Sequence, residues 1–181
     1  MKKIFTYLLH GLFFLLVMEF MFKIQIQNKP GDFFFVLIIE LPFLLLAYFT
    51  SKRVFKNSRK RELWIYLIYG LIGLIFIEWI FVGNTPFVLP NLLYQFMMFS
   101  YWGGAVVFSR ILTDKNDSVK KIRTWTLRYF VIYSIIAITF GFLVPSGTLE
   151  QRMIPILLMA IAGYGLMNIF YIWYFVKSSK K

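Results

Sequence analysis

The sequence predicts an all-α polytopic membrane protein, a single bundle of six transmembrane helices with the N and C termini in the cytoplasm. Three observations lead to this prediction. First, 60% of the residues are hydrophobic and 21% are aromatic, whereas a soluble domain averages about 45–50% apolar residues. Second, the chain contains six apolar stretches, each of about the length that crosses a bilayer. Third, almost all Lys and Arg residues lie on one side of those stretches.

The length and continuity of the stretches favour helices. A hydrocarbon core about 30 Å thick requires a helix of roughly 20 mostly apolar residues, with a range of about 17–25. The stretches are continuously apolar rather than alternating, which disfavours the strands of a closed barrel. The connections are short, so we expect one domain over residues 1–181. The six predicted spans are residues 4–22, 33–50, 64–82, 91–112, 125–144 and 153–176.

Polar and charged residues bound the first three spans. The first span follows Lys2 and Lys3 and lacks a small-residue cleavage pattern, so we expect a retained helix rather than a removed signal peptide. The second lies between a polar connection at 23–32 and a strongly basic run at 52–61. The third begins at Trp64, and indole rings favour the headgroup level of a membrane.

The last three spans have boundaries of the same kind. The fourth follows a connection that contains Pro90 and reaches the interface near Arg110. The fifth begins at Trp125. The sixth carries Trp173 near its end and is followed by the basic residues 177–181. Each of these spans is thus expected to end at a membrane surface.

The distribution of Lys and Arg predicts the orientation. Seventeen of the twenty lie near the N-terminus, in or beside the connections between spans 2 and 3 and between spans 4 and 5, or in the C-terminal tail. The other three are Lys23, Lys29 and Arg152. Short connections rich in Lys and Arg remain in the cytoplasm. We therefore expect a multi-pass protein of the cell membrane with both termini cytoplasmic.

The net charge of +12 bears on the partners of the protein. A basic chain can indicate nucleic-acid binding, but here no basic domain carries the charge, so we expect no nucleic-acid partner. We expect membrane lipids, with anionic headgroups at the cytoplasmic face, where each basic residue contributes about 1 kcal/mol. A cytoplasmic protein docked at 52–61 is the alternative.

Small residues such as Gly70 and Gly73 permit close helix packing, and a homo-oligomer or a larger membrane complex stays open.

Cysteine and histidine usage excludes several kinds of chemistry. The chain has no cysteine and a single histidine, His10. Disulfides, thiolate catalysis and thiolate metal sites are therefore excluded, and one histidine provides neither a metal site nor a haem pair. We expect no metal and no cofactor, and we interpret His10 as a buried neutral hydrogen-bonding group.

Three carboxyl groups at membrane depth are the main functional signal. An ionised carboxylate at a helix centre costs about 2.5–3.5 kcal/mol on insertion scales, and such residues usually face the bundle interior. Glu19 and Glu78 lie near the outer ends of spans 1 and 3. Glu40 lies eight residues after Asp32, about 12 Å in at 1.5 Å per residue. Pro42 frees a backbone carbonyl nearby, which predicts a polar notch beside Glu40.

Further polar and aromatic residues occur at the same depth. Asn91 and Gln95 are four residues apart and share one face of the fourth span, although Asn91 can simply cap that helix. Trp79 is expected near the outer interface. Trp102 lies at mid-depth, where it either packs inside the bundle or lines a cavity. We hypothesise that these residues and the carboxyl groups Glu19, Glu40 and Glu78 converge on a cavity in the outer half of the bundle.

Three functions stay open at this stage. The first is binding or transport of a small amphipathic or cationic molecule, because carboxylates supply charge and aromatic faces attract cations. The second is an intramembrane isomerase or cyclase acting on an isoprenoid or lipid, with Glu40 and Glu78 as catalytic acid and base. The third is a membrane scaffold or assembly factor without a ligand. The sequence contains no motif that chooses among them.

Overall fold

The computed structural model describes residues 2–33, 37–54, 60–83, 91–145 and 147–178, and every regular element within these ranges is a helix. The elements η1, η3 and η5 are π-helical, whereas η2 and η4 are short 3-10 turns. In chain order the elements are α1 (Lys2–Glu19), η1 (Phe20–Ile26), η2 (Pro30–Asp32), α2 (Leu37–Val54), α3 (Arg61–Ile72), η3 (Gly73–Phe81), α4 (Asn91–Thr113), η4 (Asp117–Val119), α5 (Lys120–Leu143), α6 (Leu149–Ala160), η5 (Ile161–Gly165) and α7 (Leu166–Ser178).

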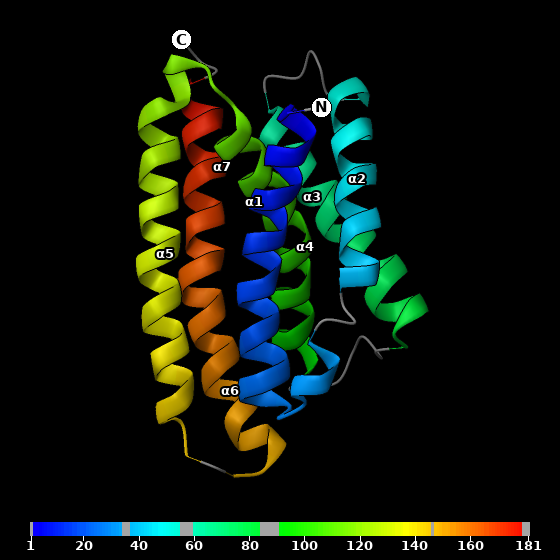
Figure 1. The fold of residues 1–181 in the computed structure, drawn as a ribbon, viewed down its shortest axis with the longest axis vertical. Coiled ribbons are helices and arrows are strands. Elements are labelled where there is room, and N and C mark those ends of the chain that lie inside the picture. The colour runs from blue at the N-terminus through cyan, green and yellow to red at the C-terminus, as the bar shows by residue number, and fades with distance from the viewer. Residues whose placement is uncertain (1, 34–36, 55–59, 84–90, 146, 179–181) are drawn as a thin grey trace.

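The long helices run side by side as a bundle with two distinct ends (Figure 1). α1 begins and α7 ends at the same end, where α2 and α4 also end and α3 and α5 begin. The strongly basic parts of the sequence flank these helix termini. We call this the basic end of the bundle and the other the opposite end.

Five helical stretches of the described residues are long and apolar enough to cross a membrane, which is consistent with a membrane location. The helix α4 is not among them, although its 23 residues extend about 35 Å at 1.5 Å per residue. The five stretches are Lys2–Ile26, Pro30–Lys52, Arg61–Phe81, Lys120–Leu143 and Gln151–Lys177.

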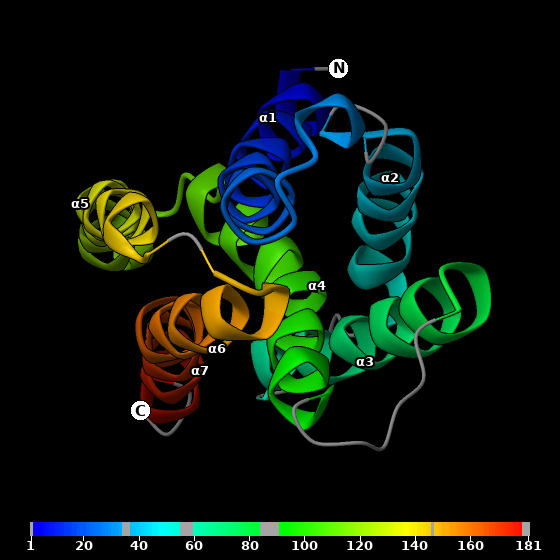
Figure 2. The ribbon, with the colours of Figure 1, turned by 90° about the horizontal axis from the view of Figure 1, so that it is seen from below.

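The position of α4 explains why it is less continuously apolar than its neighbours. α4 runs through the centre of the bundle, with α1, α2, α3 and the α6–α7 helix around it (Figure 2). Every residue from Tyr101 to Ser109 is buried. Because other helices cover this part of α4, its polar and small residues contact protein rather than surroundings.

The outward faces of the bundle carry large apolar side chains. Ile80 is 68% exposed, Phe142 66% and Ile135 62%. Exposed apolar surface on this scale marks contact with lipid or with another protein. Charged side chains, in contrast, gather toward the helix ends.

Glycine permits a close approach between α3–η3 and α4. A Cβ atom added at Gly73 would lie 2.0 Å from Cγ of Trp102, and one at Gly103 would lie 2.5 Å from the backbone oxygen of Tyr66. A Cβ at Gly70 would lie 2.7 Å from the ring of Phe99. The small residues therefore form a packing seam that holds Trp102 against η3.

Several predicted boundaries differ from the observed ones. The first helix continues through η1 to Ile26, so Lys23 lies within a helix rather than in a connection. α2 ends at Val54, beyond the predicted end of the second span. The sixth predicted span consists of α6 and α7 joined through η5. The three π-helical segments were not predicted, because apolar periodicity does not distinguish a π turn from an α turn.

Candidate functional site

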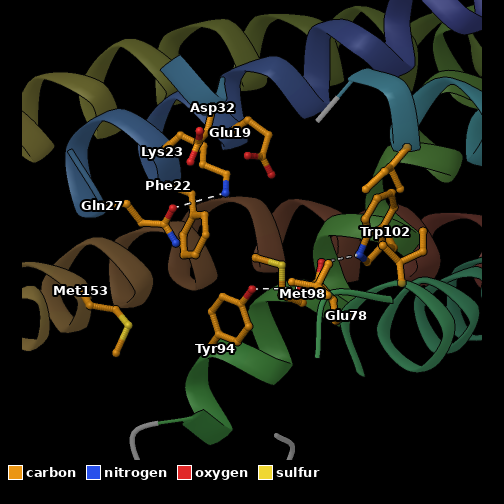
Figure 3. Close-up of a pocket in the computed structure, with 13 residues that line it drawn as sticks. Glu19, Phe22, Lys23, Gln27, Asp32, Glu78, Tyr94, Met98, Trp102 and Met153 are labelled. Carbon is orange, nitrogen blue, oxygen red and sulfur yellow. Dashed lines mark hydrogen bonds between the residues drawn. The ribbon is translucent and has the colours of Figure 1, made fainter. Parts of the chain in front are cut away.

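A cavity of about 490 Å³ lies at the opposite end of the bundle, around the first turns of α4 (Figure 3). Its wall combines acidic, basic, aromatic and thioether side chains contributed by seven helical elements and the adjoining turns. The residues that line it are Glu19, Phe22, Lys23, Gln27, Asp32, Ile39, Ile77, Glu78, Val82, Tyr94, Met98, Trp102 and Met153.

Acidic groups outnumber basic groups in this cavity. Glu19, Asp32 and Lys23 lie on one wall, and Glu78 lies across from them with the rings contributed by α4 (Figure 3). Nζ of Lys23 donates a hydrogen bond to Oε1 of Gln27 at 3.3 Å. Three carboxyl groups and one ammonium give the cavity a negative potential when the carboxyl groups are ionised, and such a potential concentrates cations.

Two aromatic donors from α4 orient the Glu78 carboxyl group. Nε1 of Trp102 donates to Oε1 at 3.1 Å, and the hydroxyl of Tyr94 donates to Oε2 at 3.0 Å. Each oxygen thus accepts a hydrogen bond from a rigid side chain. Because hydrogen bonds to a charged acceptor are stronger than neutral ones, this arrangement suits a fixed carboxylate at the cavity wall.

Both glutamates of the cavity wall occur at π-helical segments. Glu19 is the last residue of α1, directly before η1, and Glu78 lies within η3. A π turn shifts the register of a helix face and is frequent at functional sites. Here the carboxyl groups of Glu19 and Glu78 lie on opposite walls of the same cavity (Figure 3).

Tyr101 connects Glu19 with Glu40. Its hydroxyl donates to Oε1 of Glu19 at 3.1 Å and also contacts Oε1 of Glu40. Tyr101 is 1% exposed and Glu40 is 0% exposed. Glu40 therefore does not line the cavity but lies behind Tyr101, one side chain away from Glu19.

The shared hydroxyl has a consequence for protonation. A phenol has one O–H donor, so it cannot donate to two carboxylates at once. Both contacts are hydrogen bonds only if one carboxyl group is protonated and donates to the phenol oxygen. The chain Glu40–Tyr101–Glu19 can thus hold a proton and move it between a fully buried acid and the cavity wall.

The predicted polar notch at Pro42 does not adjoin this chain. Pro42 and Ile38 lie on the exposed face of α2, whereas Glu40 is buried against α4. The proline and the carboxyl group are on opposite faces of the helix. The partner of Glu40 is a tyrosine on another helix, not the carbonyl freed by the proline.

Two further predicted site residues pair with each other. Nε1 of Trp79 donates to Oε1 of Gln95 at 2.7 Å, which links η3 to α4 beside the cavity, and neither side chain belongs to the cavity lining. Asn91 begins α4, but its side chain lies outside the described residues. Of the seven predicted residues, Glu19, Glu78 and Trp102 line the cavity, and Glu40 is connected to Glu19 through Tyr101.

Sequence reasoning missed several residues that matter here. Tyr101 was not singled out, although a buried tyrosine hydroxyl usually needs a partner and three buried carboxyl groups were available. Lys23 and Asp32 were assigned to an outer connection because they are charged. Lys23 lies at the cavity wall because the first helix continues through η1, and η2 brings Asp32 there.

The described residues contain no group of three or more His, Asp or Glu side chains arranged to hold a metal ion. Nδ1 of His10 lies 3.4 Å from Oγ1 of Thr113, which places the histidine toward the basic end. The cavity can therefore provide charge, aromatic faces and a proton-carrying chain.

In comparisons of the whole chain with known proteins, no protein-family model, no curated protein and no solved structure matches the chain.

Proposed function

We propose that this chain is an integral protein of the cell membrane that binds or transports a small amphipathic or cationic molecule through the cavity at the opposite end. The observation that carries the proposal is the composition of the cavity wall. The wall contains three carboxyl groups and one lysine, together with the rings of Phe22, Tyr94 and Trp102. Carboxylates attract a cation by charge, and aromatic faces add cation–π attraction of about 0.5–2 kcal/mol.

The size of the cavity fits a small molecule. Ligand pockets have volumes of about 300–1,000 Å³ and combine apolar walls with a few fixed polar groups. At about 490 Å³, the cavity lies within this range. Met98 and Met153 supply adaptable apolar surface, so an amphipathic cation would place its charge near Glu78 and its apolar part against the thioethers.

The proposal includes six transmembrane spans, with α4 as the additional one. α4 runs alongside α1 in the bundle (Figure 1), and its length of about 35 Å is sufficient for a hydrocarbon core of about 30 Å. Neighbouring helices cover its polar residues, so α4 need not be uniformly apolar. With six spans, both termini lie on one side.

The proposed orientation places the basic end in the cytoplasm. The Lys and Arg residues at that end follow the bias of cytoplasmic connections, and anionic lipid headgroups are the partners expected there. The cavity then lies on the outer side. The chain Glu40–Tyr101–Glu19 would let ligand binding release or take up a proton, because a cation beside Glu19 favours its ionised form.

The proposal can be tested with a lipophilic cation and its charge-reversed counterpart. The probes are radiolabelled tetraphenylphosphonium and tetraphenylborate, which have the same shape, and binding is measured by scintillation proximity on the purified protein. We expect saturable binding of the cation. Glu78→Gln should weaken it about tenfold or more, equivalent to about 1.4 kcal/mol, because the amide keeps the shape but removes the charge.

The matched control is Asp117→Asn. Asp117 is an exposed carboxylate in η4, away from this cavity, so its loss should leave cation binding unchanged. Equal binding of both probes, or wild-type affinity in Glu78→Gln, would contradict the proposal.

A second candidate function is an intramembrane isomerase or cyclase. The observation that favours it is the contact of Glu19 and Glu40 with one phenol, which keeps a protonated acid next to a second carboxyl group. If the protein is an enzyme, Glu19→Gln should retain binding of a prenyl substrate but abolish its conversion. The conversion is measured by mass spectrometry of the product. A binding protein or transporter predicts no conversion by the wild type either.

A further inference from the structure

A second cavity, of about 330 Å³, lies at the basic end, where the start of α1, the end of α2, the start of α3 and the end of α4 meet. It is separate from the cavity of the proposed function. Four of its lining residues are the cationic Lys3, Lys52, Arg61 and Arg110, and one is the acidic Asp114. We propose that this cavity binds the phosphate group of an anionic ligand.

The positive charge in this cavity is only partly neutralised. Glu62 pairs with Arg110 through two hydrogen bonds, at 2.8 and 3.1 Å, and Ser51 accepts from the same guanidinium at 3.2 Å. Asp114 accepts a hydrogen bond from the backbone N–H of Asn116 at 2.9 Å, as in a local turn. The acidic groups therefore fix Arg110 and shape a turn, and they leave the cavity with excess positive charge.

Two buried polar atoms on lining residues have no hydrogen-bond partner among the described residues. They are the hydroxyl of Tyr7 and Nε of Arg61. Tyr7 is 2% exposed, so its hydroxyl does not have ready access to bulk water. Buried polar groups in proteins nearly always have a partner. An acceptor-rich group inside the cavity would provide one for both.

Phosphate fits this set of donors. Its oxygens accept several hydrogen bonds, and the planar guanidinium of Arg binds two of them side by side. Nζ of Lys52 lies 3.8 Å from the ring centroid of Tyr48, and both residues line the cavity. Charge that only sets membrane topology needs no buried donors, so the buried Tyr7 and Arg61 atoms favour a binding site over topogenic charge alone.

The experiment measures the thermal stability of the purified full chain, by tryptophan fluorescence, against two sources of phosphate. One arm adds inorganic pyrophosphate to the protein in detergent. The other places the protein in nanodiscs of phosphatidylcholine with increasing phosphatidylglycerol. Stabilisation by pyrophosphate identifies a soluble phosphate ligand. Stabilisation by phosphatidylglycerol alone identifies a lipid headgroup.

Three variants separate a specific site from general charge attraction. Tyr7→Phe removes only the unpartnered hydroxyl, so it should leave the ligand-free protein as stable as wild type and weaken ligand binding about tenfold. Arg61→Gln should weaken binding by at least as much. Lys115→Gln removes an exposed charge at the same end but outside the cavity, and it should have no effect.

Either of two results would overturn the proposal. One is that neither phosphate source stabilises the wild type. The other is that Tyr7→Phe and Arg61→Gln respond to the ligands as Lys115→Gln does, since the attraction would then be due to net charge alone.

Discussion

Replacement of Tyr101 by Phe tests the connection between Glu19 and Glu40 directly. The change removes one hydroxyl and keeps the ring, which packs against Trp102 with ring centroids 4.9 Å apart. Glu40 then loses its described hydrogen-bond partner while it stays fully buried. Glu19 lines the cavity, where water can replace the lost donor, so most of the effect should come from Glu40.

The expected magnitude follows from the burial of Glu40. Leaving a buried donor or acceptor without a partner costs about 1–3 kcal/mol. For a chain of this size 1 kcal/mol lowers the melting temperature by roughly 2–4 °C, so a loss of about 2 kcal/mol lowers it by about 4–8 °C. The assay is thermal unfolding of the purified protein followed by the fluorescence of its five tryptophans.

A double variant and a matched control make this prediction sharper. Tyr101→Phe/Glu40→Leu removes both partners, so it should be more stable than Tyr101→Phe alone, because apolar replacement of both partners is nearly neutral. Tyr7→Phe removes a buried hydroxyl without a described partner and should not lower the melting temperature. An unchanged melting temperature in Tyr101→Phe, or no recovery in the double variant, would refute the reasoning.

Three other changes have expected outcomes for stability. Gly73→Ala should destabilise the protein by about 1–3 kcal/mol, because its Cβ would lie 2.0 Å from Cγ of Trp102; a wild-type melting temperature would contradict this packing. Glu62→Gln should lower the free energy of unfolding by about 2 kcal/mol, because Arg110 loses a charged partner at 2.8 Å. A double-mutant cycle with Arg110→Gln should show positive coupling, and additive effects would argue against the pair. Thr148→Ala removes the capping box at the start of α6 and should destabilise the first turn of that helix by about 1 kcal/mol. Amide hydrogen exchange in this turn should become faster, and unchanged exchange would show that the cap is dispensable.

The fold class was predictable because composition and length suffice for it. The all-helical structure and the apolar helices long enough to cross a membrane are confirmed among the described residues. The count of six spans and the orientation stay predictions, because they depend on a surrounding membrane. α4 shows the limit of an apolarity criterion, since a helix covered by its neighbours can carry Ser100 and Tyr101 at its centre without contact with lipid.

The arrangement of the site was less predictable than its depth. Position along a helix gives the depth of a residue, but the rotation of the helix decides which cavity or neighbour it faces. Glu19 and Glu78 have similar depths and line one cavity, whereas Glu40 lies behind the wall of that cavity and faces Tyr101. The π turns η1 and η3 change the rotation locally, so a regular 3.6-residue period cannot place the residues that follow them.

The central claim is that the cavity lined by Glu19 and Glu78 is a binding site for a cationic or amphipathic small molecule. Native mass spectrometry of the protein released from its own membrane tests it most directly, with wild type beside Glu19→Gln/Glu78→Gln. The account predicts a specific bound species that carries a positive charge, retained by the wild type and lost from the double variant while the variant stays folded. The same bound species on both proteins, or bulk phospholipid alone on both, would contradict it.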